Sequence, residues 1–82
     1  MTTPPVQLSS APRGAYLVDR LDEATPPALR ARLLELGLTT GAPLQVWRDG
    51  SRITLTLRHS HLIVRRAEVD GVWVTARGGR GL

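Results

Sequence analysis

The sequence predicts a mainly β domain, a small barrel of five short strands capped by one short α-helix at about residues 26–36. Ile53, Leu55 and Leu57 alternate with polar residues, which is typical of a strand with one buried face. Asp49-Gly50 is a strong type I′ hairpin signal. The helix carries an apolar stripe that it cannot bury alone, so we expect it to pack against the sheet.

The helix is bounded by residues that favour a start and a stop. Thr25 is expected as the N-cap, and two prolines follow in the first turn, where a missing N–H costs little. Gly37 can adopt the left-handed conformation that ends a helix. The apolar stripe follows the i, i+4, i+7 spacing of one helix face and consists of Leu29, Leu33 and Leu36.

The strands are expected at residues 15–21, 43–48, 51–57, 61–65 and 72–75, with one helical turn within residues 66–70. Short strands with tight turns leave edges and an apolar face uncovered unless they close, so a strongly bent barrel is the economical arrangement. The expected core consists of Leu17 or Val18, Leu21, Leu29, Leu33, Leu36, Leu38, Leu44, Val46, Ile53, Leu55, Leu57, Leu62, Val64, Val72 and Val74.

One stretch of the chain resembles a known family. Residues 30–41 read RARLLELGLTTG, and LIVRRAEV and VWV follow at residues 62–69 and 72–74. This pattern is similar to the FeoA domain of bacterial ferrous iron uptake, and also to the C-terminal SH3-like domain of iron-dependent repressors. The resemblance implies an SH3-like barrel over residues 8–75. The ends, residues 1–7 and the basic tail 76–82, are expected to be flexible.

Composition narrows the classes of function. The 82 residues suit a single domain, and the absence of cysteine excludes disulfides, zinc fingers and a cysteine nucleophile. We see neither a signal peptide nor an apolar run long enough to span a membrane, so a cytoplasmic protein is expected. All eleven basic residues are arginine and the net charge is +4, which favours acidic partners.

Catalysis has little support in the sequence. No spacing brings a nucleophile, a base and an orienting group together, and no glycine-rich loop opens a helix to cradle a phosphate. We therefore expect a binding module rather than an enzyme. A single Arg-Gly-Gly unit at residues 77–79 lacks the aromatic residues of RNA-binding segments, so nucleic acid is not the expected partner.

His59 and His61 form the one metal-like spacing in the chain. Side chains at i and i+2 of a strand share a face, so the two imidazoles could bind one ion, such as Fe(II) or another divalent transition metal. They supply only two ligands, and a carboxylate would have to arrive through the fold. The alternative is a pair of solvated turn histidines.

Trp47 and Trp73 are out of phase with the core positions of their strands, so both indoles could lie on the outer surface. Exposed tryptophans are good anchors for a protein partner or for self-association into a homo-oligomer. The alternative is a position at the barrel end, covered by the helix or a loop.

Leu34 points away from the helix stripe. It either packs under the loop that precedes the helix or forms a docking patch with Leu38. Arg30 and Arg32 flank the stripe, where they could supply charge to a partner. The arginine at position 32 recurs in the resembled family, and we expect it to hold the helix to the preceding loop through Asp22 or Glu35.

The resemblance implies a non-enzymatic cytoplasmic accessory that docks on the GTP-hydrolysing ferrous iron permease. The residues expected to contact that partner are Trp47, Trp73, Leu34, Leu38, Arg30 and Arg32. The alternative function is a stand-alone domain of the iron-dependent repressor type, associated with a peptide or with DNA.

Overall fold

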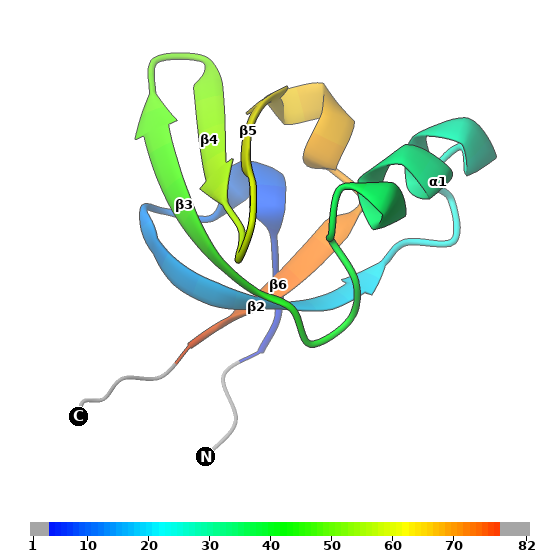
Figure 1. The fold of residues 1–82 in the computed structure, drawn as a ribbon, viewed down its shortest axis with the longest axis horizontal. Helices are drawn as coiled ribbons and strands as arrows, with labels where there is room; N and C mark the ends of the chain where they lie inside the picture. The colour runs from blue at the N-terminus through cyan, green and yellow to red at the C-terminus, as the bar shows by residue number, and fades with distance from the viewer. Residues whose placement is uncertain (1–3, 78–82) are drawn as a thin grey trace.

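The computed structural model describes residues 4–77 (Figure 1). Six strands, one α-helix and two 3₁₀ turns follow one another along the chain. Their bounds are β1 (Val6–Gln7), η1 (Leu8–Ser10), β2 (Gly14–Leu21), α1 (Pro27–Glu35), β3 (Pro43–Asp49), β4 (Arg52–Thr56), β5 (His61–Arg65), η2 (Arg66–Val69) and β6 (Val72–Ala76). The mainly β class, the helix and the helical turn before the last strand are as predicted.

All six strands belong to one antiparallel sheet with the order β1-β6-β2-β3-β4-β5. The sheet is strongly bent, so that β3 and β4 rise from the curved β2 while β6 crosses below (Figure 1). The two outer strands, β1 and β5, are not paired with each other. The closed five-stranded barrel predicted from the sequence is therefore not what forms. The structure is an open, six-stranded sheet.

Two 3₁₀ turns connect the two ends of the open sheet. η1 follows β1 and η2 follows β5, and the two turns contact each other. The guanidinium Nε of Arg66 in η2 donates a hydrogen bond to the Ser9 carbonyl in η1 (3.3 Å). The ends of the sheet are thus joined through these turns and not by a β1–β5 pairing.

The missing strand of the prediction is β1. Val6 lies opposite Val74 and Gln7 lies opposite Trp73, so both residues belong to the sheet although they fall in the predicted flexible segment 1–7. Likewise β6 extends to Ala76, one residue beyond the expected domain end. Residues 1–3 and 78–82, which hold the rest of the two predicted flexible ends, lie outside the described residues.

The predicted N-cap of α1 is wrong, because the helix begins one residue later than predicted. An N-cap side chain accepts a hydrogen bond from the N–H of the second or third helical residue. With Thr25 as the cap, the second helical residue would be Pro27, which has no N–H. Pro26 takes the cap position instead, and the Thr25 hydroxyl is buried without a hydrogen-bond partner among the described residues.

The predicted glycine stop is confirmed. Gly37 has φ +105° and donates its N–H to the Leu34 carbonyl, while Leu38 donates to the Leu33 carbonyl, both at 3.0 Å. This pair of bonds is the Schellman motif, which satisfies two carbonyls at the helix end. It also turns Leu38 back toward the core.

The hydrophobic core lies on the inner face of the bent sheet, under α1. It consists of Leu8, Ala11, Tyr16, Val18, Leu21, Leu33, Leu38, Leu44, Val46, Ile53, Leu55, Leu57, Val64, Val69, Val72 and Val74. Most of this set is as predicted. Leu29 and Leu62 pack against it while half-buried, and Leu36 is also only half-buried.

The burial pattern of β2 shows which of its residues face inward. Tyr16 and Val18 are buried, so Val18 rather than Leu17 belongs to the core. A register shift between Val18 and Arg20 then moves Leu21 to the inner face. The shift leaves Arg20 exposed, because an extra residue in a strand reverses the alternation beyond it.

Tyr16 also ties the bend before β2 to the sheet. Its hydroxyl donates to the Pro12 carbonyl (2.6 Å), and Nη1 of Arg48 in β3 donates to the Ala11 carbonyl (2.9 Å). Burial raises the pKa of the Tyr16 phenol, and the Arg48 charge opposes part of that rise. The phenol therefore remains a neutral donor at neutral pH.

The first hairpin turn is shifted by one residue from its predicted position. Asp49 lies opposite Arg52, so the loop between β3 and β4 consists of Gly50 and Ser51 rather than Asp49 and Gly50. Gly50 has φ +63°, a left-handed conformation that glycine adopts without strain.

Gly71 allows the turn before β6 to lie against the loop before α1. The Asp22 N–H donates to the Gly71 carbonyl (2.6 Å). A Cβ at position 71 would collide with the Thr25 hydroxyl and would lie 3.3 Å from the Cβ of Asp22. Any larger residue must push this loop, and with it the start of α1, away from the sheet.

We predict that Gly71→Ala lowers the free energy of unfolding by about 2 kcal/mol, because the added methyl overpacks the contact with Thr25. Thr25→Ala alone should be close to neutral, since it removes a buried hydroxyl that has no partner in the described structure. In the double variant part of the loss should be recovered. Urea unfolding of the three variants measures this coupling, and simple additivity would contradict the proposed collision.

Candidate functional site

The two histidines of the predicted metal site lie at the turn between β4 and β5. The Leu57 N–H donates to the Ser60 carbonyl (2.8 Å) and closes this turn, in which His59 is exposed. His61 is the first residue of β5, and its Nδ1 lies 3.3 Å from the Thr56 hydroxyl. Within residues 4–77, no group of three histidine, aspartate or glutamate side chains is close enough to hold a metal ion.

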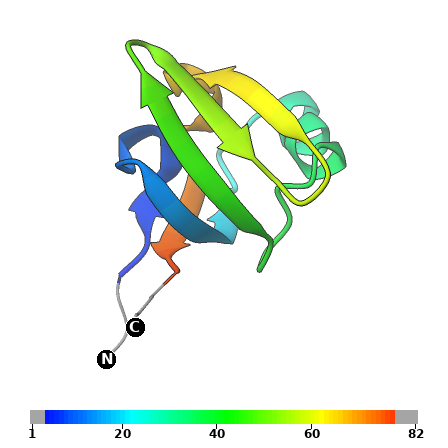
Figure 2. The same cartoon turned by 60° about the vertical axis from the view of Figure 1, so that its left-hand side comes forward.

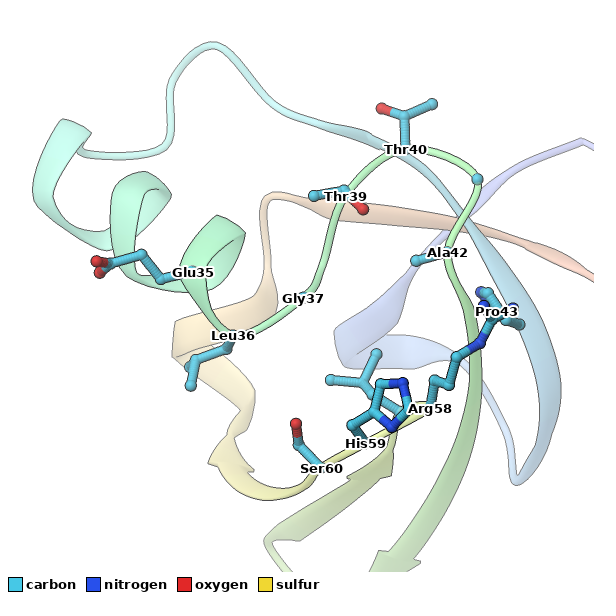
Figure 3. Close-up of a pocket in the computed structure, with 12 residues that line it drawn as sticks. Glu35, Leu36, Gly37, Thr39, Thr40, Ala42, Pro43, Arg58, His59 and Ser60 are labelled. Carbon is cyan, nitrogen blue, oxygen red and sulfur yellow. The ribbon is translucent and has the colours of Figure 1, made fainter.

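His59 and His61 also open onto different pockets. His59 lines a pocket of about 510 Å³ between the turn and the loop that follows α1 (Figure 3). His61 lines a smaller one between α1 and β5. In Figure 3, Arg58 and His59 face the 37–43 loop, while the Glu35 carboxylate points away from them. The donors on this wall are basic or neutral, so they do not make up the ligand set of a divalent cation.

Trp47 and Trp73 differ in how much of each side chain is exposed. Trp47 in β3 is 48% exposed, and the Arg13 guanidinium lies over its ring, 5.0 Å from the centroid. Trp73 in β6 is half-buried, with Arg20 4.8 Å above its ring and an indole N–H that is buried without a partner among the described residues. Trp47 therefore offers a contact surface, and Trp73 is largely covered.

The two indoles do not form one patch. Their arginine neighbours stand near opposite ends of β2, seven residues apart in sequence at positions 13 and 20. At about 3.3 Å per residue of extended chain, that spacing separates them by roughly 20 Å. A single partner segment would contact one indole or the other.

The predicted patch of Leu34 and Leu38 is wrong. Leu38 is completely buried, because the Schellman motif directs it into the core, where it is inaccessible to a partner. Leu34 is 40% exposed and so is not covered by the loop before α1. It remains a single apolar contact on the outer side of the helix.

The roles of the two helix arginines are exchanged relative to the prediction. Arg30, not Arg32, holds α1 to the preceding loop. It is half-buried, and its Nη1 donates to the carbonyls of Leu21 (3.4 Å) and Asp22 (3.2 Å). Arg32 is exposed, and none of the hydrogen bonds or ion pairs found in the described residues involves its side chain.

Ile63 is an exposed residue that the sequence analysis missed. It lies in β5 and is 68% exposed, the largest exposure of any large apolar side chain in residues 4–77. Ile63 is opposite Thr54, and Thr54 is opposite Trp47, so the three form a row across the outer face of β5, β4 and β3. The sequence signal for the exposure of Ile63 was its position between Leu62 and Val64, both of which were predicted to face the core.

Comparison with known proteins decides the family. A family model described as the FeoA domain matches residues 6–76. The chain belongs to the FeoA domain family. A solution structure of a FeoA protein from Chlorobium tepidum superposes with a TM-score of 0.77 at 31% identity, covering 93% of this FeoA domain and 74% of that chain. No curated protein matches the sequence.

Other solved structures share the fold. A crystal structure described as an iron uptake regulatory protein (FeoA) matches with a TM-score of 0.74 at 23% identity, covering 88% of this domain and 97% of that chain. A manganese-dependent transcriptional repressor matches with a TM-score of 0.78 at 18% identity, covering 93% of this domain but 44% of the repressor. This FeoA domain therefore corresponds to less than half of the repressor.

The resemblance of residues 30–41 and 62–74 to the FeoA domain is thus confirmed. The SH3-like repressor domains share the fold alone at this identity. Within residues 4–77, no helix has the length and hydrophobicity required to cross a bilayer.

We predict that Arg30→Met lowers the free energy of unfolding by about 1–2 kcal/mol, because the carbonyls of Leu21 and Asp22 lose a charged donor. Arg32→Met, the matched control on the same helix, should stay within about 0.5 kcal/mol of the parent. Urea unfolding at constant pH provides both values. Equal losses in the two variants would contradict the assignment of the tether to Arg30.

The metal hypothesis for His59 and His61 stays a prediction and can be tested directly. If the two imidazoles share an ion, anaerobic titration with Fe(II) or Zn(II) should show one-equivalent binding that the double variant His59→Ala/His61→Ala loses. Ser60→Ala, which keeps both histidines, is the control. Unchanged affinity in the double variant would remove the hypothesis.

Proposed function

We propose that this FeoA domain is a non-enzymatic, cytoplasmic accessory of bacterial ferrous iron transport that docks on the GTP-hydrolysing permease. The family match over residues 6–76 and the likeness to the Chlorobium tepidum FeoA protein support the link to iron uptake. Docking on the permease comes from the family resemblance, and fold alone does not give function.

The observation that carries this proposal is the exposed row of Trp47, Thr54 and Ile63. Trp47 is 48% and Ile63 is 68% exposed, whereas the inward neighbours Val46 and Val64 are buried and Leu62 is half-buried. Exposed large aromatic residues next to aliphatic ones are the usual anchors of protein contacts. Such a row favours a partner that covers the outer face of β3, β4 and β5.

Charge around the row favours an acidic partner. Arg52 and Arg65 lie directly opposite each other beside the row, and like charges in that position repel unless a counter-charge is present. In the part of the chain that the structure describes, neither guanidinium forms an ion pair, although Asp49 lies opposite Arg52 and the Glu68 carboxylate accepts the Arg65 N–H, so each guanidinium could take a further counter-charge. An acidic surface would supply it and would speed association.

We predict that a tagged form of this domain co-purifies with the detergent-solubilised permease of the same organism. Trp47→Ala should weaken this binding by about tenfold or more, the loss typical of an aromatic anchor. Leu34→Glu tests whether the helix also contacts the permease, and Glu23→Ala in the exposed loop before α1 is the control.

Absence of co-purification with the parent domain would contradict the proposed partner. Retained binding in both Trp47→Ala and Leu34→Glu would leave the partner in place and overturn the proposed surface. Each variant needs the same unfolding transition as the parent, so that lost binding is not lost folding.

A further inference from the structure

Strand β5 has one edge that no other strand covers. The bond from Leu57 N–H to the Ser60 carbonyl fixes the phase of the β4–β5 ladder, since hydrogen-bonded pairs alternate in an antiparallel pair. Leu62 and Val64 therefore bond to β4. His61, Ile63 and Arg65 direct their N–H and C=O groups away from the sheet.

At one end of this edge, the backbone N–H already has a hydrogen-bond acceptor. The Glu68 carboxylate in η2 accepts a hydrogen bond from the Arg65 N–H (2.9 Å). Among the residues that the structure describes, no comparable bond engages the N–H of His61 or Ile63. The stretch from His61 to Ile63 is thus ready to pair with another strand.

A groove runs beside this edge, between β5 and α1. It has a volume of about 190 Å³, and Figure 2 shows α1 next to β5. Its apolar lining consists of Leu29, Leu33, Leu36, Leu62 and Val64, and Arg32 and Glu68 also line it. An uncovered strand edge beside an apolar pocket is the arrangement in which domains accept an extended peptide as an added strand.

The charged side chains near the edge favour an acidic segment over a second copy of this domain as the occupant. A second copy pairing antiparallel around Ile63 would bring Arg65 of one copy opposite His61 of the other, between two molecules of net charge +4. Arg52, next to Arg65, would add to the repulsion. Charged residues on an edge strand oppose such self-pairing. With Arg32 across the groove, these arginines outnumber the nearby carboxylates of Glu68 and Asp49, so the edge keeps a net positive charge and attracts an acidic segment.

We propose that the groove between β5 and α1 binds an extended, acidic segment of a partner protein as an additional strand. Alternate residues of that segment point inward, where apolar side chains contact the half-buried Leu36 and Leu62. The residues between them point outward beside Ile63, where carboxylates face Arg65. This deepens the proposed function, on which it rests, by naming the kind of permease segment that the domain recognises.

The first test uses a short, capped peptide of alternating glutamate and valine. In an NMR titration we expect shifts and slowed hydrogen exchange at the amides of His61 and Ile63, with the amide of Val46 in the central sheet unchanged. A peptide of alternating lysine and valine is the control and should bind about tenfold more weakly. No response to the glutamate peptide, or an equal response to both, would overturn the proposal.

A proline variant tests the backbone pairing itself. Ile63→Pro removes an N–H that points away from the sheet, so the β4–β5 ladder keeps its bonds, as proline on an edge strand allows. Ile63→Thr keeps that N–H while shortening the side chain. We expect Ile63→Pro to lose about tenfold or more in affinity for the glutamate peptide and Ile63→Thr to lose much less. Equal affinities would overturn the strand pairing.

A charge-reversal variant tests the role of Arg65 without introducing a proline into the strand. Arg65→Glu changes an exposed side chain and should exchange the preference, so that the lysine peptide binds the variant better than the glutamate peptide does. An unchanged preference would overturn the role of Arg65. Sedimentation of the parent without peptide completes the test, because a dimer that Ile63→Pro dissociates would show that a second copy is the occupant instead.

The co-purification assay separates this inference from the proposed function. If the parent and Ile63→Pro both bind the permease equally, the accessory function holds and strand addition at β5 is overturned. If the parent fails to bind the permease but the glutamate peptide still protects the Ile63 amide, the groove is supported and the assigned partner is wrong.

Discussion

One small core, shared by nearly every element, is the constraint on which this domain depends. A chain of this size buries only about 60% of its unfolded surface, so few contacts can be spared. The bent sheet, α1 and both 3₁₀ turns send residues such as Val18, Leu33 and Val69 to the same interior. Every inward position is taken by packing. The residues left for recognition are therefore those that the strand alternation turns outward and those at the edges of the sheet.

The open sheet gives the domain two unlike edges. At one, β1 is two residues long and η1 follows it at once, so little backbone is offered. At the other, β5 is five residues long and ends where Glu68 binds the Arg65 N–H. Arg65 and Arg52 border that edge and oppose pairing between copies. An edge that opposes pairing with a second copy and also exposes Ile63 is suited to a different protein partner.

Alternation and turn chemistry predicted the parts of this structure that local sequence controls, among them the inward face of β4 and the end of α1 at Gly37. Features that depend on distant neighbours were not predictable in this way. β1 is too short to show a period, and the place of Ile63 on an edge strand depends on the strand order, although alternation with Leu62 and Val64 already indicates that it faces outward. The helix begins one residue later than predicted, so Thr25 does not cap it, and the turn after Gly37 buried Leu38. At the candidate site, Trp47 was foreseen as exposed, whereas the tether formed by Arg30 depends on where the loop carbonyls lie.

The pairing of β1 with β6 has a topological consequence. Since Val6 lies opposite Val74, the first and last described residues leave the sheet next to each other, on the strand farthest in order from β5. Neighbouring ends let a domain be inserted into a longer polypeptide, or be circularly permuted, without distorting its interior. A short connector between them, with new ends opened in the hairpin loop at Gly50, would keep every strand pairing of the sheet. The fold can thus be carried as a module within larger proteins while its opposite edge stays accessible.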